Sequence, residues 1–190
     1  MNICVFCGSS EDLDASYYKL AKRCGEVIGK SGHNLIYGAG KIGLMGRLAQ
    51  STRDNGGKSI GIIPEKLRIE GVVSDVDNEQ IITPDMKTRK DVMRNRSEAF
   101  LALPGGFGTM EELLEVITLK QLQYHNKSIV ILNGNGFFDE MLVFFERMYK
   151  ENFANASYRK LYQVENNPEQ AISAIENYKH EHIYDKYLKA

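Results

Sequence analysis

Short apolar runs alternate along the chain with longer stretches in which apolar residues recur every three or four positions. The short runs are rich in Val, Ile, Leu and Phe and mostly end directly before Gly or Pro, which is typical of buried strands. Strands are therefore predicted at residues 3–7, 34–37, 59–63, 80–83, 99–103 and 128–132.

The longer stretches predict helices. Asp14 is a suitable cap for the first of them, and glycines at positions 29 and 32 end it. Its apolar face contains Leu20, Cys24, Val27 and Ile28. Further helices are predicted at 43–54, 85–97, 109–123, 137–150 and about 169–178, with Pro168 in the first turn of the last. Residues 65–79 have mixed charge and weak periodicity, so we expect a mobile loop near a site there.

Strands of four to six residues that alternate with helices of ten or more predict an α/β fold with a doubly wound parallel sheet and helices on both faces. We expect one domain over residues 1–180 and a charged tail at 181–190. Ligands of such sheets bind beyond the carboxyl ends of the strands.

Composition limits the possible functions. The chain has 190 residues, a net charge of -1 and 43% hydrophobic residues, so a folded core is expected and a nucleic-acid partner is not favoured. The sequence has no basic segment followed by a long apolar stretch at its start and no run long enough to span a membrane, which predicts a cytoplasmic protein. Cys4, Cys7 and Cys24 form neither an even set nor a zinc pattern, so they are expected to be buried apolar residues.

Three predicted strands end in loops of small residues: Gly8-Ser9-Ser10, residues 38–46, and Pro104-Gly105-Gly106-Phe107-Gly108-Thr109. Glycine lets backbone N–H groups approach an anion closely, and a helix that starts directly afterwards adds its positive end. The loops therefore predict a phosphate-binding site, and no metal-ligand cluster accompanies them. The first loop alone also fits a plain strand-to-helix turn.

Two further motifs bear on the chemistry of the loops. Gly38, Gly40 and Gly43 form a GxGxxG, which leaves open a dinucleotide-dependent oxidoreductase with Glu65 as its acidic ribose-binding residue. The third loop is followed by Glu111 and Glu112, of which one carboxylate suffices to complement the helix dipole. Glu112 is then free to point into a cleft. No Gly-Lys-Ser/Thr follows the glycines, so ATP-driven phosphoryl transfer is disfavoured.

The predicted helix at 85–97 is strongly basic and contains Arg89 and Lys90. It fits a solvated surface equally well, but Arg89 lies one turn before Met93 on its apolar side and would then lie at the rim of the cleft. Cleavage of an N-glycosidic bond creates positive charge on the sugar, which a carboxylate stabilises, while a guanidinium binds the phosphate or the departing base. One Glu, one Arg and a phosphate site are sufficient for that reaction.

The segment from Pro104 to Glu112 resembles the PGGxGTxxE signature of the LONELY GUY (LOG) family. Met86-Lys87-Thr88-Arg89-Lys90 resembles the second motif of that family, and the loops at 7–10 and 37–46 are similar to its first two loops. The resemblance extends over about residues 1–150. Departures are Ala39, where many members have Gly, and Phe107, where Tyr is common.

The resemblance implies a Rossmann-like fold, a homodimer, and hydrolysis of a cytokinin riboside 5′-monophosphate to a free base and ribose 5-phosphate without a cofactor. It makes Arg89 and Glu112 the catalytic residues. The candidate substrate-binding residues are Ser9, Ser10, Gly40, Met45, Lys90, Gly105, Gly106, Phe107, Gly108, Thr109, Met110 and Glu111. The family often carries the label lysine decarboxylase, but no lysine is placed convincingly for the Schiff base that such chemistry needs.

Two other functions remain alongside the oxidoreductase. A salvage hydrolase acting on AMP would use the same residues, and a nucleotide-binding module without catalysis would need the loops but not both Arg89 and Glu112. The predicted helix at 137–148 carries more apolar residues than one core contact requires, so we expect it to contribute to a dimer interface; a fully internal helix fits the same pattern.

Overall fold

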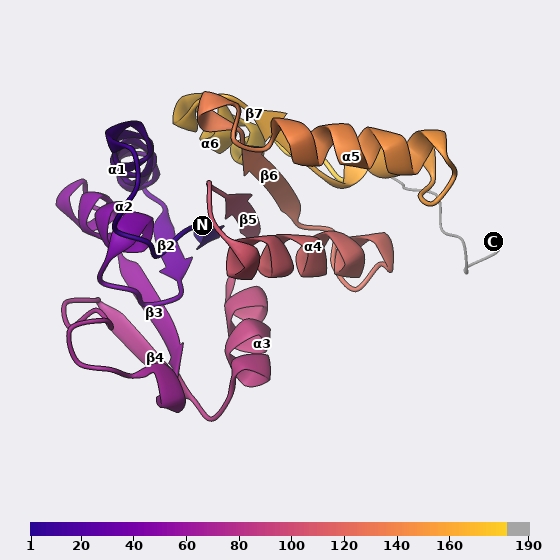
Figure 1. Ribbon diagram of the computed structural model, residues 1–190. Coiled ribbons are helices and arrows are strands. Elements are labelled where there is room, and N and C mark those ends of the chain that lie inside the picture. The colour runs from indigo at the N-terminus through magenta and orange to yellow at the C-terminus, as the bar shows by residue number, and fades with distance from the viewer. Residues whose placement is uncertain (182–190) are drawn as a thin grey trace.

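Seven parallel strands form one sheet in the order β4-β3-β2-β1-β5-β6-β7 in the computed structural model, which describes residues 1–181 (Figure 1). The strands are β1 (Asn2–Phe6), β2 (Asn34–Tyr37), β3 (Ser59–Pro64), β4 (Glu79–Thr83), β5 (Ala99–Ala102), β6 (Ser128–Leu132) and β7 (Gln163–Glu165). The predicted doubly wound parallel sheet is therefore confirmed. Of the tail expected at 181–190, all but the first residue lies outside the described residues.

Helices connect the strands. They are α1 (Ala15–Lys30), α2 (Gly43–Asp54), α3 (Met86–Arg96), α4 (Phe107–Gln121), α5 (Asp139–Lys150) and α6 (Pro168–Glu176), with short 3-10 turns at Glu65–Leu67, Gly134–Gly136 and Ala156–Leu161. Asp14 caps α1 as predicted, since its carboxylate accepts a 2.8 Å hydrogen bond from the Ser16 amide. Pro168 opens α6, also as predicted.

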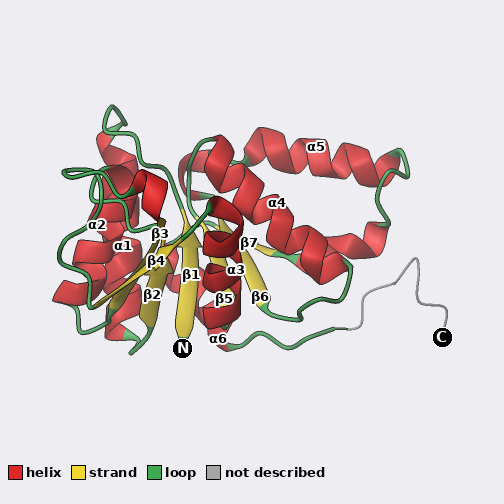
Figure 2. Ribbon diagram, turned by 90° about the horizontal axis from the view of Figure 1, so that it is seen from below, coloured by secondary structure: helices red, strands yellow, loops and turns green. Residues whose placement is uncertain are grey.

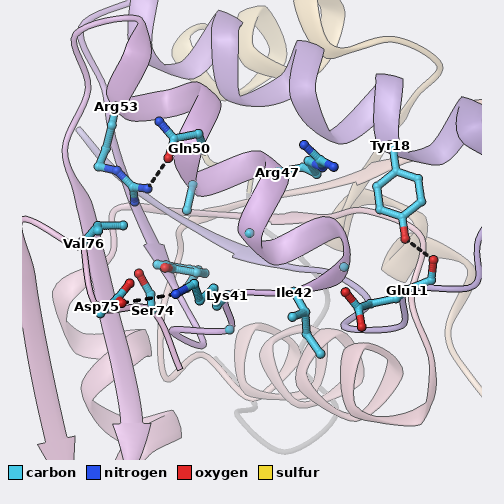
Figure 3. A pocket seen from close by; sticks show the side chains of 15 residues that line it. Glu11, Tyr18, Lys41, Ile42, Arg47, Gln50, Arg53, Ser74, Asp75 and Val76 are labelled. Atoms are coloured by element: carbon cyan, nitrogen blue, oxygen red, sulfur yellow. Dashed lines mark hydrogen bonds and ion pairs between the residues drawn. The ribbon is translucent and has the colours of Figure 1, made fainter. Parts of the chain in front are cut away.

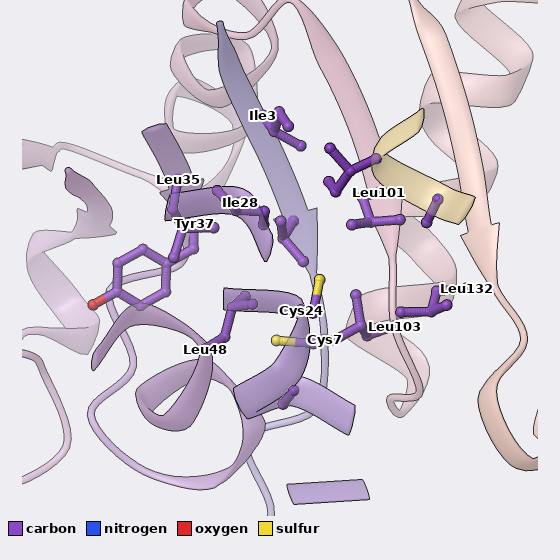
Figure 4. Packing of buried hydrophobic residues seen from close by; sticks show 14 of the residues in the cluster. Ile3, Cys7, Cys24, Ile28, Leu35, Tyr37, Leu48, Leu101, Leu103 and Leu132 are labelled. Carbon is purple, nitrogen blue, oxygen red and sulfur yellow. The ribbon is translucent and has the colours of Figure 1, made fainter. Parts of the chain in front are cut away.

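Both faces of the sheet are covered, because successive residues of a strand point to opposite sides. Ile3 and Val5 of β1 belong to the core under α1, α2 and α6, whereas Cys4 and Phe6 belong to the core under α3 and α4. Figures 1 and 2 show α1 and α2 side by side, with α3 and α4 across the sheet from them. Figure 4 shows the first of these cores, in which Cys7 and Cys24 pack among aliphatic side chains. All three cysteines are buried and free, as expected.

Several boundaries differ from those that the pattern predicts. β7 was not predicted, because its three residues are mostly exposed and polar. α4 begins two residues earlier than expected, directly after Gly106. α5 begins at Asp139 rather than at Phe137, because Asn135 has a positive φ of 59° and the chain turns there.

The strand order reverses between β1 and β5. The strands β2, β3 and β4 follow one another on one side of β1, and β5, β6 and β7 follow one another on the other side. In doubly wound sheets this switch point opens a crevice at the carboxyl edge. The loops after β1, β2 and β5 all reach this edge, so the fold brings the three glycine-rich segments together.

Candidate active site

The three glycine-rich loops are hydrogen-bonded to one another. The Gly8 amide donates to the Pro104 carbonyl at 3.0 Å, and the Leu44 amide donates to the Gly8 carbonyl at 3.1 Å. Gly105 packs so tightly that a Cβ there would overlap Thr109 Oγ1 and lie 2.9 Å from the Gly8 nitrogen. Its lack of a side chain is thus what lets the β5 loop approach the β1 loop.

The first turn of α4 faces this junction. Its N-cap is Gly106, which has no side chain that could accept a capping hydrogen bond. The amides of the first helical turn have no acceptor within the helix, and they carry the positive end of its dipole. Gly106, Gly108 and Thr109 line the adjoining cavity, so the backbone there has the properties of an anion site.

Arg89 of α3 and Glu112 of α4 form an ion pair of 2.8 Å between Nη1 and Oε1. Both side chains are nearly buried, with 12% and 13% exposure. Arg89 Nε also donates to the carbonyl of Ile62 in β3 at 3.0 Å, and the guanidinium packs on Gly38, where a Cβ would overlap it. The arginine is therefore held from three sides and does not lie on a solvated helix face.

Burial raises the pKa of the Glu112 carboxyl above its ordinary value, because removal from water disfavours the charged form. The positive charge of Arg89 and its hydrogen bond act in the opposite direction. Burial therefore makes the Glu112 carboxylate a stronger base, and the neighbouring Arg89 favours its ionised form.

A cavity of about 740 Å³ contains this pair. The candidate substrate-binding residues Ser9, Gly40, Met45, Phe107 and Glu111 also line it. One part of its wall is apolar and comes from β3, the following segment and α3: Ile63, Leu67, Ile69, Val72 and Met86. The segment at 65–79, expected to lie near a site, thus forms part of the wall of this cavity. Phe107, 95% exposed, stands at the rim.

Lys90 and Met110 do not line this cavity. Adjacent helical residues point about 100° apart, so Lys90 leaves the cavity that Arg89 enters and pairs with Glu111 and, at 3.2 Å, with Glu115. Arg94 completes this group with a 2.6 Å ion pair to Glu115. Met110 packs against the core beneath α4. Ser10 and Gly105 line a smaller cavity on the other side of the β5 loop.

A buried carboxylate that the sequence pattern did not reveal fastens the segment after β3. The Asp77 side chain is 1% exposed and accepts hydrogen bonds from Tyr37 Oη at 2.8 Å, Ser59 Oγ at 2.6 Å and Arg53 Nη1 at 3.2 Å. The Lys41 amide also donates to the Val72 carbonyl and the Ser74 amide to the Ala39 carbonyl, each at 2.8 Å. The apolar wall of the cavity is therefore tied to the loop after β2.

A second large cavity, of about 810 Å³, lies on the other side of the Gly40–Ile42 segment (Figure 3). Lys41 pairs there with Asp75 at 3.2 Å, and Arg53 is held by Gln50 and Asp77. Arg47 lies near the ring of Tyr18. Most of the charged groups in this cavity are thus already paired. Glu65 lines neither this cavity nor that of Arg89, so the ribose-binding carboxylate of the oxidoreductase alternative is not found in either cavity.

Comparison with known proteins identifies the family. A family model described as "Possible lysine decarboxylase" matches residues 45–175. The cytokinin riboside 5′-monophosphate phosphoribohydrolase LOG2 of Arabidopsis thaliana is 38% identical over 188 residues, which are 98% of this chain and 88% of that protein. This chain belongs to the LOG family. LOG4 of the same plant, with the same activity in its name, is 38% identical over 186 residues, or 97% of this chain and 86% of that protein.

Among solved structures, the molybdenum cofactor binding protein of Rippkaea orientalis superposes on this LOG-family chain with a TM-score of 0.70. The match covers 92% of this chain and 94% of that one at 23% identity, a level at which it shows the shared Rossmann-like fold. Within residues 1–181, no helix is long and apolar enough to cross a membrane. The same residues contain no group of three or more His, Cys, Asp or Glu side chains suited to a metal ion.

Proposed function

We propose that this chain hydrolyses the N-glycosidic bond of nucleoside 5′-monophosphates with an adenine-type base, and releases the free base and ribose 5-phosphate. The observation that carries the proposal is the 2.8 Å pair of Arg89 and Glu112 in a cavity that also contains the glycine loops. Relatives that match nearly the whole chain are named for this reaction on cytokinin nucleotides.

In the proposed reaction, the oxygen of a water molecule forms a bond to C1′ of the ribose while the bond from C1′ to the base nitrogen breaks. Glu112 accepts a proton from that water, and its negative charge stabilises the cationic sugar at the transition state. The departing base takes the bonding electron pair and receives a proton, which balances the one that Glu112 took from the water and later releases, so that the carboxylate is regenerated. Arg89 keeps Glu112 ionised and donates hydrogen bonds to the substrate.

The phosphate is proposed to bind at the first turn of α4. Backbone amides of Gly106 to Thr109 supply the donors there, and Ser9 adds a hydroxyl from the β1 loop. This orientation directs the base toward the apolar wall that contains Leu67, Ile69 and Val72. Because that wall suits an aliphatic group on the base, we propose prenylated adenine nucleotides as better substrates than AMP.

The decarboxylase in the name of the family model implies pyridoxal phosphate, which needs a lysine for its Schiff base. None of the residues of the described chain that line the cavity of Arg89 and Glu112 is a lysine. The residues present do not fit that cofactor, and no step is assigned to it.

The direct test is to incubate the purified protein with AMP and, separately, with N6-isopentenyl-AMP, and to quantify free base by chromatography. The proposal expects base from the prenylated nucleotide at a rate well above that from AMP. Similar rates from the two nucleotides would indicate a general salvage hydrolase that acts on AMP, in place of a cytokinin-activating enzyme. Nucleotide binding without base release from either compound would leave a binding module in place of the enzyme.

Glu112→Gln tests the assignment of the carboxylate. We expect kcat to fall by about 10²–10⁴-fold, the usual contribution of a general base, while nucleotide affinity changes little. Glu140→Gln, an exposed change in the first turn of α5, is the matched control. Equal losses of affinity and rate in Glu112→Gln would contradict the catalytic role.

A homodimer is also proposed. Val143 and Phe144 of α5 are 70% and 58% exposed, and Phe107 of α4 is exposed beside the cavity. Large exposed apolar side chains of this kind often mark an interface between protein chains. Sedimentation equilibrium at micromolar concentration should give twice the mass of the chain, and a monomer at that concentration would refute the dimer.

A further inference from the structure

Two cavities lie on either side of the switch point of the sheet. The cavity of Arg89 and Glu112 opens at the ends of β1, β2 and β3. The smaller one, of about 380 Å³, opens between the loops that follow β1, β5 and β6. They share three residues, Gly8, Ser9 and Gly106, which belong to the loops proposed to bind phosphate. One anion site therefore adjoins two separate cavities.

The smaller cavity has the walls of a ring-binding site. Leu13, Tyr17, Leu44, Pro104 and Phe137 supply most of its side-chain surface. The rings of Tyr17 and Phe137 meet edge to face, with centroids 5.9 Å apart and an angle of 84°. Phe137 is 40% exposed, so part of its ring is free for contact. Apolar walls with an accessible aromatic ring suit a flat heteroaromatic base, which gains stacking energy there.

Doubly wound sheets bind dinucleotides across the crevice at the point where the strand order reverses, with the pyrophosphate at a helix N-terminus. The arrangement described above has all three elements: a crevice between β1 and β5, the uncapped start of α4, and one cavity on each side. We propose that this protein also binds ligands in which two nucleosides are joined by a pyrophosphate, with one base in each cavity. The inference rests on the phosphate site of the proposed function but not on its catalysis.

The proposed ligand competes with a nucleoside monophosphate, because both occupy the shared loops. No redox step is included, since the proposal concerns binding alone. Residues of the smaller cavity are not part of the candidate catalytic pair. Changes to Phe137 or Tyr17 are therefore expected to act on the second base and to leave the binding of AMP unaltered.

The experiment compares diadenosine 5′,5′-diphosphate with ADP-ribose and AMP by isothermal titration calorimetry. ADP-ribose is the matched ligand, because it has the pyrophosphate and both riboses but lacks the second base. We expect the wild-type protein to bind diadenosine diphosphate about tenfold more tightly than ADP-ribose, in line with stacking of one base on an aromatic ring. Equal affinities for the two ligands would overturn the proposal.

Phe137→Ala should abolish that tenfold preference and retain the affinity for AMP. Phe144→Ala removes a phenylalanine of α5 that is also exposed but lies outside both cavities, and should keep the preference. If Phe137→Ala does not fold by circular dichroism, Tyr17→Leu provides the same test. A preference that survives the substitution would place the second base elsewhere and refute the assignment. A protein that shows the preference but releases no base from nucleotides would refute the proposed function and uphold this inference.

Discussion

Arg89 and Glu112 face each other at 2.8 Å across the carboxyl edge of the sheet, although 23 positions separate them in the chain. Each comes from a different helix, and their sequence neighbours Lys90 and Glu111 also pair with one another. Of these two neighbours, Lys90 lies outside the cavity and Glu111 lines it. The ion pair sets the charge state of the one carboxylate that the proposed reaction requires. The effect of this ion pair on Glu112 is most directly measured from the pH dependence of the reaction rate.

The pH profile should show the influence of burial on Glu112. Since burial raises the pKa of this carboxyl and the ionised form is the active one, kcat/KM should fall with decreasing pH at values above the usual range of a glutamate. In Arg89→Gln the opposing charge is gone, so the pKa rises further and the acid limb moves to higher pH. An acid limb that stays in place or moves to lower pH in this variant would contradict the electrostatic role of Arg89.

The ion pairs between α3 and α4 should position Arg89 opposite Glu112. Glu115 accepts from both Lys90 and Arg94, so Glu115→Gln weakens two links between the helices. We expect about a tenfold lower kcat from misplacement of the pair, with a loss of unfolding free energy of about 1 kcal/mol or less. Steady-state kinetics and urea denaturation measure the two effects.

Glu146→Gln, which removes an exposed pair with Arg159 far from the cavity, is the control for the loss of a surface ion pair. It should leave kcat unchanged. The positioning role would be wrong if both variants had wild-type rates, or if the conservative Glu115→Asp failed to restore part of the activity.

Asp77→Asn should destabilise the fold, because it leaves Arg53 without its buried partner and weakens hydrogen bonds from Tyr37 and Ser59. Breaking a buried ion pair typically costs roughly 3 kcal/mol or more. Asp75→Asn breaks only the exposed pair with Lys41 and should cost about 1 kcal/mol at most. Chemical denaturation of the two variants side by side gives the comparison, and equal stabilities would show that Asp77 does not fasten this segment.

The neighbouring glycines Gly105 and Gly106 should differ in how much stability the fold loses when a methyl group is added. An added methyl group at 105 overlaps Thr109, so Gly105→Ala should lower the unfolding free energy by about 1–3 kcal/mol, the usual cost of overpacking. No atom lies within 4 Å of a Cβ at 106, so Gly106→Ala should be as stable as wild type. A thermal melt checks both statements, and a destabilised Gly106→Ala would contradict the described loop geometry.

The sequence pattern predicted six of the seven strands because each is an apolar run that ends near Gly, Pro or Asn. β7 was not predicted, since an edge strand with one valine between two polar residues has no apolar run, and its pairing with β6 appears only in the fold. The family motifs contain Arg89 and Glu112, and the structure brings the two residues together in one cavity. The motifs could not show that Arg89 lines the cavity while Lys90 does not, because successive residues of a helix point about 100° apart and the sequence does not say which of them faces the cavity.

The Asp77 cluster was invisible to sequence reasoning for a different reason. Its partners Tyr37, Arg53 and Ser59 come from β2, α2 and β3, so no local spacing brings them together. Asp77 itself lies in a segment of mixed charge that resembled a mobile loop. A buried carboxylate in such a segment becomes recognisable only when its donors are placed in space.

The hydrogen bond from Arg89 to the carbonyl of Ile62 has a consequence for how the site can be varied. The guanidinium is held by the backbone of β3, an interior strand of the sheet, and not by residues 66–71 of the segment after it. Substitutions in that segment can therefore alter the apolar wall without removing this contact of Arg89. The fold therefore assigns the ion pair and the apolar wall to different parts of the chain, and the shape of the wall can change while the pair keeps its geometry.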